Sequence, residues 1–322
     1  MIARLRTTLT SWEGFLFGVL LALILVNAIA SPFFLTVGNQ INMFQLSIEK
    51  IIVALVMTFV IINGEIDLSV ASIMGLSACA FGWLFQQGVP AGGAVAIALA
   101  IGVLCGAFNA FWIVGFGIPS LVVTLATMIA FRGFARVLLE DRGATDFPGW
   151  FDALGQRGLI GPVTLAMIIF AVFAAIGVLI LQRTAFGRKV YFIGANRAVA
   201  EYSGLDVRAV KARIFIASGV ISALAGLLFA ARVGAVRGDI ASGFELDIIT
   251  MVLLGGVSIF GGAGTMSGTI LAILIVLNLR NGMALANITG HIQTGVLGIL
   301  LILSVMVPLI RETAGRLITR VR

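Results

Sequence analysis

Ten apolar runs recur along the chain, and all except the short eighth and ninth are close to the length that a helix needs to cross a membrane. They cover residues 15–30, 46–62, 66–85, 91–114, 119–139, 162–181, 214–231, 246–260, 266–279 and 292–310. About 20 apolar residues in an α-helix span about 30 Å of hydrocarbon. With 60% hydrophobic and 11% charged residues, the chain has too many apolar side chains for a water-soluble globule. The pattern predicts an all-α polytopic membrane protein of about ten transmembrane helices, with residues 1–322 as a single transmembrane domain.

The first apolar run has two interpretations. It follows Arg4 and Arg6 and ends in Ala28-Ile29-Ala30, which has the form of a signal-peptidase site. Pro32, close behind, is equally natural as the stop of a first transmembrane helix. Both interpretations stay open, and under either one the chain emerges on the outer side.

The distribution of charge predicts the orientation in the membrane. With the N-terminus inside, the cytoplasmic segments hold most of the 21 Lys and Arg residues, and this satisfies the positive-inside rule. Residues 183–213 then form a cytoplasmic loop, residues 140–161 a periplasmic loop, and both termini are cytoplasmic. The net charge of +7 therefore reflects topology, and no basic-aromatic array suggests nucleic acid as a partner. The outer segments collect acids, namely Glu140, Asp141, Asp146, Asp152, Asp239, Glu245 and Asp247.

The segment 183–213 is the only long polar stretch between two long apolar ones. Asn196 is placed to cap the start of a short helix, and Gly204 to end it in a left-handed conformation. The segment is either a basic loop that only fixes orientation or a docking surface for another protein. Arg197 favours docking, because a cation in the first turn opposes the helix macrodipole. Three apolar residues would share one face of the helix, namely Ala198, Val199 and Tyr202.

Glycine interrupts the apolar pattern in two places. Residues 254–268 contain six glycines, and a second break lies at residues 63–69. So much glycine costs helix stability and is typical of close backbone packing or of a re-entrant path. Five crossings in each half would make the second half inverted relative to the first, and paired broken segments of this kind indicate a transport path.

Over residues 33–308 the sequence resembles the permease subunits of monosaccharide ABC importers of the ribose, xylose, arabinose and rhamnose type. The resemblance rests on GEIDLSV at 64–70, on GR at 187–188 followed by GAN at 194–196, Ala198 and SG at 203–204, and on GFELD at 243–247 followed by LGG at 254–256 and GGAG at 261–264. Where the family often has an acidic residue, this chain has Arg197. The resemblance implies a bacterial inner-membrane permease that works by alternating access.

The same resemblance implies three protein partners: a separate ABC ATPase, a periplasmic sugar-binding protein, and a second permease that is either identical or similar. The central loop would contact the ATPase through Gly187, Arg188, Gly194, Asn196, Arg197, Ala198, Val199, Tyr202 and Gly204. On the outer side Arg232, Arg237 and Asp239 either meet the binding protein or belong to a solvated loop.

Several classes of chemistry are disfavoured. None of the lysines, Lys50, Lys189 and Lys211, lies in a phosphate-binding P-loop, so ATP and Mg would be bound by the partner ATPase and this chain is expected to bind no cofactor. Cys79 and Cys105 lie in apolar runs as ordinary packing residues, which implies neither a disulfide nor a metal site. The chain is expected to be a transporter subunit and not an enzyme.

Five polar residues in or near apolar runs are candidates for the translocation path. Each has a structural alternative: a carboxylate at a helix start caps free N–H groups, and amides inside membrane helices join neighbouring helices. The candidates are Asp67, Ser69, Asn109, Asn278 and Asn281. Aromatic residues that would stack on sugars or anchor helix ends at the interface are Trp83, Trp112 and Trp150.

The rival function is an ion-coupled secondary carrier for a small polar solute. Such carriers commonly need an ionisable group inside the membrane, whereas the middle of each long run here is free of charge. An intramembrane enzyme is disfavoured because the single histidine, His291, has no acidic neighbour in sequence. The sequence names neither the sugar nor the type of permease pair.

Overall fold

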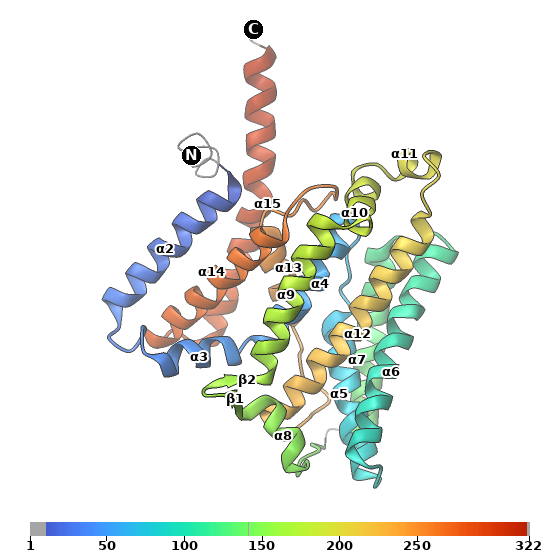
Figure 1. The fold of residues 1–322 in the computed structure, drawn as a ribbon, viewed down its shortest axis with the longest axis vertical. Helices are drawn as coiled ribbons and strands as arrows, with labels where there is room; N and C mark the ends of the chain where they lie inside the picture. Colours follow the sequence, from blue (N-terminus) through green and yellow to red (C-terminus); the bar gives the residue numbers. More distant parts are fainter. Residues whose placement is uncertain (1–10, 141, 321–322) are drawn as a thin grey trace.

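The computed structural model describes residues 11–140 and 142–320, with side chains placed as far as Met306, and it is almost entirely helical (Figure 1). Arg4, Arg6, Asp141 and the basic side chains near the C-terminus, on which part of the charge pattern rests, lie outside this description. The first half contains α2 (Trp12–Ala30), α3 (Val37–Gln45), α4 (Ile48–Ile62), α5 (Val70–Gln86), α6 (Ala91–Ala110), a π-helical turn (Phe111–Gly115) and α7 (Ser120–Leu139). The remainder contains α8 (Gly149–Gln156), β1 (Gly158–Ile160), β2 (Val163–Thr164), α9 (Leu165–Arg183), α10 (Ala185–Ala195), α11 (Arg197–Tyr202), α12 (Val207–Val233), α13 (Phe244–Leu254), α14 (Met266–Leu285) and α15 (Gly290–Arg320).

Several helices have the length and composition of membrane spans. Within the described ranges six qualify alone, namely α2, α6 with its π turn, α7, α9, α12 and α14. The pair α3 and α4, bent by 57°, counts as a seventh if it is one broken span. The apolar helix α5 and the apolar part of α15 are shorter, and α13 has only 11 residues. The prediction of a helical membrane protein is confirmed, whereas the number of about ten crossings stays a prediction.

Helix α4 forms the centre of the molecule. Every one of its 15 residues except Phe59 is buried, which is the pattern of a helix surrounded by other helices. It packs against α9, α12, α13 and α14. Helix α12 is the corresponding long helix of the second half and packs against α4, α5, α6 and α8.

The elements follow the same order in both halves of the chain. Each half begins with a long helix, which one or two short helices, a central helix and three more helices follow. The first half runs in this way from α2 to α7, and the second from α9 to α15. The packing is reciprocal, because α4 contacts α13 and α14 while α12 contacts α5 and α6. The two glycine-containing breaks do not correspond in this order, since 63–69 joins α4 to α5 and 255–265 joins α13 to α14. They meet in space instead.

Helix α12 lies against α6 through small residues. A side chain on Gly102 would collide with the Gly219 carbonyl group, and one on Gly106 would lie 2.8 Å from the Ile216 Cα. Such close backbone approach is a common way for helices to associate in membranes, where the hydrophobic effect does not hold them together.

Several predicted boundaries differ from the structure for local reasons. The run 46–62 begins at the bend between α3 and α4, and α5 begins only at Val70, after the break at 63–69. Helix α12 begins at Val207, before the predicted 214, because the side chain of Asp206 caps it by accepting from the Ala209 nitrogen at 2.9 Å. The predicted loop 183–213 contains α10 and α11, and the predicted loop 140–161 contains α8 and β1.

Candidate functional site

Helix α10 rests on the two glycine-containing breaks. A side chain on Gly194 would collide with the carbonyl oxygen of Ile62 and would lie 2.7 Å from the nitrogen of Gly262. A side chain on Gly261 would lie 2.7 Å from the Cα of Gly64. Glycines from three distant parts of the sequence therefore let three backbone segments touch, and we call this contact between 62–64, 194–195 and 261–262 the glycine junction.

Hydrogen bonds hold the glycine junction together. The nitrogen of Gly262 donates to the Ile62 oxygen at 2.8 Å. The Tyr191 hydroxyl of α10 donates to the Gly264 oxygen at 2.7 Å. Burial raises the pKa of the Tyr191 phenol, so this donor keeps its proton at neutral pH. Movement of α10 is thus linked to both breaks.

Charged side chains join the helices around the glycine junction. Lys211, near the start of α12, forms an ion pair with Glu65 in the first break, and both side chains are largely buried. Thr265, which caps the start of α14, donates to Glu13 at the start of α2 at 2.9 Å. The end of the molecule that carries α10 and α11 is therefore tied to α2, α4, α12 and α14.

Helix α11 projects from this end of the molecule (Figure 1). The predicted caps are present: Asn196 accepts from the Val199 nitrogen at 3.1 Å, and Gly204 has a φ of 77°. Ala200 is buried toward the protein, whereas Val199 is 48% and Tyr202 94% exposed. The face that was predicted to dock, with Ala198, is left uncovered by this chain.

Arg197 has a partner on the same helix. Its Nε lies 2.9 Å from Glu201 Oε1, and both side chains are about half exposed. An exposed pair of this kind contributes little to stability. Glu201 is the residue of α11 that supplies a carboxylate at this surface, and Arg197 pairs with it.

Three of the predicted path residues form one buried cluster. Asp67 Oδ1 accepts from the nitrogen and the hydroxyl of Ser69 at 2.9 and 2.6 Å. Ser218 of α12 donates to Asp67 Oδ2 at 2.8 Å, and Asn109 of α6 donates to the Ser69 hydroxyl at 2.8 Å. Asp67 is 1% exposed. The cluster joins the first break to α6 and α12.

The other two predicted path residues lie apart from this cluster. Asn278 in α14 accepts through its backbone oxygen from the Asn27 side chain at 2.9 Å. Asn281 exchanges two hydrogen bonds of 2.9 Å with Asn39 of α3. The Asn281 side chain thus joins α14 to α3, which is the structural alternative that the sequence offered, whereas the Asn278 side chain donates to the Leu274 oxygen of its own helix at 2.7 Å.

The opposite end of the molecule contains ion pairs that the sequence analysis missed. Lys50 Nζ lies 3.1 Å from Asp247 Oδ2, and Arg280 lies 2.7 Å from both Asp247 oxygens. Arg132 lies 3.4 Å from Glu245. These pairs join α4, α7, α13 and α14. The signal that could have revealed them is the neighbouring pair Glu49 and Lys50 at the start of α4, where two charged residues interrupt an apolar run.

Arg232, one of the predicted docking residues, forms an ion pair within the chain. Arg232 Nε lies 2.6 Å from Glu49 Oε1, and the Glu49 side chain is fully buried. Arg237 and Asp239 are exposed and 3.7 Å apart. With Arg136 they line an open hollow of about 470 Å³ on the surface. Arg136, which the sequence analysis did not select, thus lies beside Arg237.

A family model for the permease component of branched-chain amino acid transport systems matches residues 39–305. The chain belongs to this permease family. It is accordingly a multi-pass inner-membrane protein, and the prediction that it is a permease of the ABC-importer class is confirmed.

Similar proteins are permeases named for one import system. The autoinducer 2 import system permease protein LsrD of Yersinia enterocolitica is 38% identical over 79% of this permease and 78% of its own length. The proteins of the same name from Salmonella paratyphi A and Photorhabdus laumondii are 35% and 34% identical, each over 92% of this permease and over 91% and 90% of their own lengths. No solved structure matches it.

The remaining aromatic candidates take separate positions in the permease. Trp83 and Trp150 are partly exposed, at 37% and 53%, near the ends of α5 and α8. Trp112 packs between Phe108 and Phe116 in and beside the π turn. The three tryptophans belong to different elements, namely α5, the π turn and α8.

Proposed function

We propose that this permease carries a monosaccharide, such as a pentose or a deoxyhexose like rhamnose, or a related sugar-like molecule, across the bacterial inner membrane. The support comes from the family and from relatives named for autoinducer 2 import. Autoinducer 2 is therefore the first solute to test. Transport would draw on ATP and Mg bound by a separate ABC ATPase, with no cofactor on this chain.

Ten crossings are proposed for the membrane topology. The six long helices, the bent pair α3 and α4, and the shorter α5, α13 and α15 give this number. The order of elements and the reciprocal packing of α4 and α12 support two related halves, inverted because each has an odd number of crossings. The end with α10 and α11 would be cytoplasmic, as would both termini.

A reporter enzyme that is active only outside the cytoplasm tests this topology. Fused after Gly149 it is expected to be active, and fused after Arg197 it is expected to be inactive. The reverse pattern contradicts the proposed orientation.

The ATPase would bind at α10 and α11. The single observation that carries this role is the uncovered apolar face of α11, where Tyr202 is 94% exposed on a helix that projects from the molecule. Gly194 and the glycine junction would pass movement of α10 to α4 and to the start of α14. Gly187, which is buried against the end of α9, and Arg188, which is exposed, would support and flank this surface.

The periplasmic binding protein would dock at the opposite end. Arg237 and Arg136 beside the surface hollow would meet acidic side chains of that protein, and Asp239 would meet a basic one. Arg232 would act indirectly, because its guanidinium already pairs with Glu49.

Sugar would cross beside the polar cluster of Asp67, Ser69 and Asn109 and past Asn278 and Asn281 when the two halves separate. In the described conformation these groups bond to neighbouring side chains or to the backbone, which supports a path that is closed in this conformation. A second copy of the permease, or a similar one, would complete the path.

Cross-linking tests the proposed coupling surface. Tyr202→Cys in the permease, expressed with its ABC ATPase, is expected to cross-link to the ATPase, whereas Trp150→Cys at the opposite end is not. Equal cross-linking of both variants, or of neither, contradicts the assignment. An ion-coupled carrier would need no such contact.

A further inference from the structure

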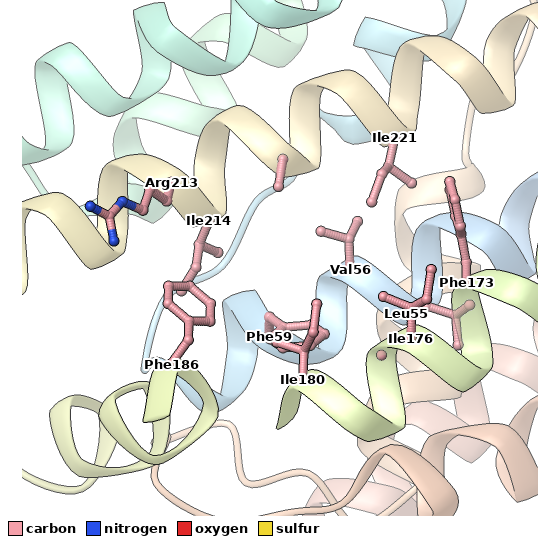
Figure 2. Close-up of a pocket in the computed structure, with 12 residues that line it drawn as sticks. Leu55, Val56, Phe59, Phe173, Ile176, Ile180, Phe186, Arg213, Ile214 and Ile221 are labelled. Atoms are coloured by element: carbon pink, nitrogen blue, oxygen red, sulfur yellow. The ribbon is translucent and has the colours of Figure 1, made fainter. Parts of the chain in front are cut away.

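A groove runs between α4, α9 and α12 on the side of the molecule (Figure 2). It has a volume of about 360 Å³ and is open along one side. Its walls include Val56 and Phe59 from α4, Ile176 and Ile180 from α9, and Ile221 from α12. These side chains point into the space between the three helices in Figure 2.

The chemistry of the lining excludes a sugar as the natural occupant. Every residue that lines the groove is apolar except Arg213. A hydroxylated solute would lose its hydrogen bonds to water there and find no partners along the walls. A hydrocarbon chain loses nothing of this kind, so the groove suits a flexible apolar chain.

Arg213 gives one end of the groove a positive charge. It is exposed at the end of the groove next to α10, whereas Ile221 lies eight residues along α12, or about 12 Å away. Among the described residues no carboxylate pairs with Arg213, in contrast to Lys211, which pairs with Glu65. The charge is therefore available to an external anion.

The length and position of the groove match one leaflet of a bilayer. Half of the hydrocarbon core is about 15 Å thick, and the groove extends about 12 Å from the basic end. With the orientation proposed above, this is the inner leaflet. Basic side chains at the cytoplasmic end of a gap between membrane helices are suited to anionic lipid headgroups.

We propose that the groove binds an acyl chain of an inner-leaflet anionic phospholipid, with Arg213 contacting the headgroup phosphate. This inference rests on the proposed orientation of the permease. Since α4 and α10 border the groove and also meet at the glycine junction, the bound lipid would lie beside the element that is proposed to receive ATPase movement.

Native mass spectrometry of the purified full-length permease tests the proposal. Phosphatidylglycerol or phosphatidylcholine is added to the detergent-solubilised protein, and the bound fraction of each is measured. Arg213→Gln is expected to weaken phosphatidylglycerol binding at least tenfold and phosphatidylcholine binding less, because the choline cation of phosphatidylcholine offsets the charge of its phosphate. Arg208→Gln is the matched control, because Arg208 is also exposed on α12 but lies about 140° around the helix and does not line the groove.

A second variant separates the groove from general surface charge. Ala217→Leu places a larger side chain in the groove and is expected to reduce binding of both lipids while Arg213 is intact. Equal phosphatidylglycerol binding by the wild type, Arg213→Gln and Ala217→Leu overturns the proposal. So does a disulfide between two copies of Ile176→Cys in native membranes, because that result assigns the groove to a second permease. Neither readout involves ATPase or solute, so failure here leaves the transport function standing.

Discussion

The backbone nitrogen of Gly262 lies 2.8 Å from the carbonyl oxygen of Ile62, and Gly194 of α10 lies directly over this contact. Residues 62, 194 and 262 come from three separate parts of the chain. A movement of α10 therefore acts on the end of α4 and on the loop before α14 at the same point. This is the physical basis for the proposed coupling role of α10 and α11.

Adding a single methyl group at the glycine junction is expected to impair the permease. Gly194→Ala forces the Ile62 carbonyl group and the Gly262 backbone apart, at a cost of about 1–3 kcal/mol for overpacking. We expect a lower melting temperature in detergent and loss of uptake. Gly133→Ala is the control, because nothing lies within 4 Å of a side chain there. Equal behaviour of the two variants would contradict a tight junction.

A charged side chain on the exposed face of α11 is expected to uncouple ATP hydrolysis from transport. Ala198→Glu alters the surface beside Val199 and Tyr202 without touching the core, so the variant should fold normally. Uptake should fall at least tenfold, and the ATPase should no longer be stimulated by loaded binding protein. Ala198→Ser, which is small and uncharged, should keep both activities. Normal uptake by Ala198→Glu would remove this face from the coupling surface.

The buried cluster around Asp67 is expected to depend on Ser218. Ser218→Ala removes the hydroxyl group that donates to Asp67 Oδ2, and leaving a buried polar group unsatisfied costs about 1–3 kcal/mol, or more for a charged one. Ser222 lies one turn further along α12, and its buried hydroxyl has no partner among the described residues. Thermal unfolding in detergent should thus show a loss for Ser218→Ala and little change for Ser222→Ala. Equal shifts would mean that the Ser218 hydroxyl contributes no specific bond.

The ion pairs at the end of the molecule opposite α11 are expected to be structural. Asp247→Asn leaves Lys50 and Arg280 close together without their shared carboxylate, and breaking a buried pair costs about 3–5 kcal/mol. Asp239→Asn removes a carboxylate from an exposed pair and should change the melting temperature little. Replacing Lys50 by Met together with Asp247→Asn should recover part of the loss. If the double variant recovers none of the lost stability, Lys50 and Asp247 do not stabilise each other.

Local signals in the sequence were sufficient for α11 but not for α10. Asn196 and Gly204 determine the ends of α11 by capping, which depends on neighbours only a few residues away. Helix α10 was missed because the charged pair Arg188 and Lys189 hides the three-residue spacing of its buried Gly187, Val190 and Ile193.

Contacts between distant segments were beyond prediction from one sequence. Asp67 was correctly suspected of bonding to nearby backbone, since it accepts from the Ser69 nitrogen, but its other partner, Ser218, lies 151 residues away. Likewise, nothing close to Arg232 in sequence indicates that its guanidinium pairs with Glu49. Composition predicted the class of protein, whereas the pairing of polar groups required the helices to be placed.

Reconstitution of transport in lipid vesicles tests the central claim most directly. The permease is inserted with its ABC ATPase, binding protein is added outside, and autoinducer 2 and labelled pentoses or deoxyhexoses are offered as solutes. We predict accumulation of one such solute only when ATP is present on the side of α11, and none with Ala198→Glu. Accumulation by the permease alone on an ion gradient, without nucleotide, would contradict ATP-driven coupling through α10 and α11.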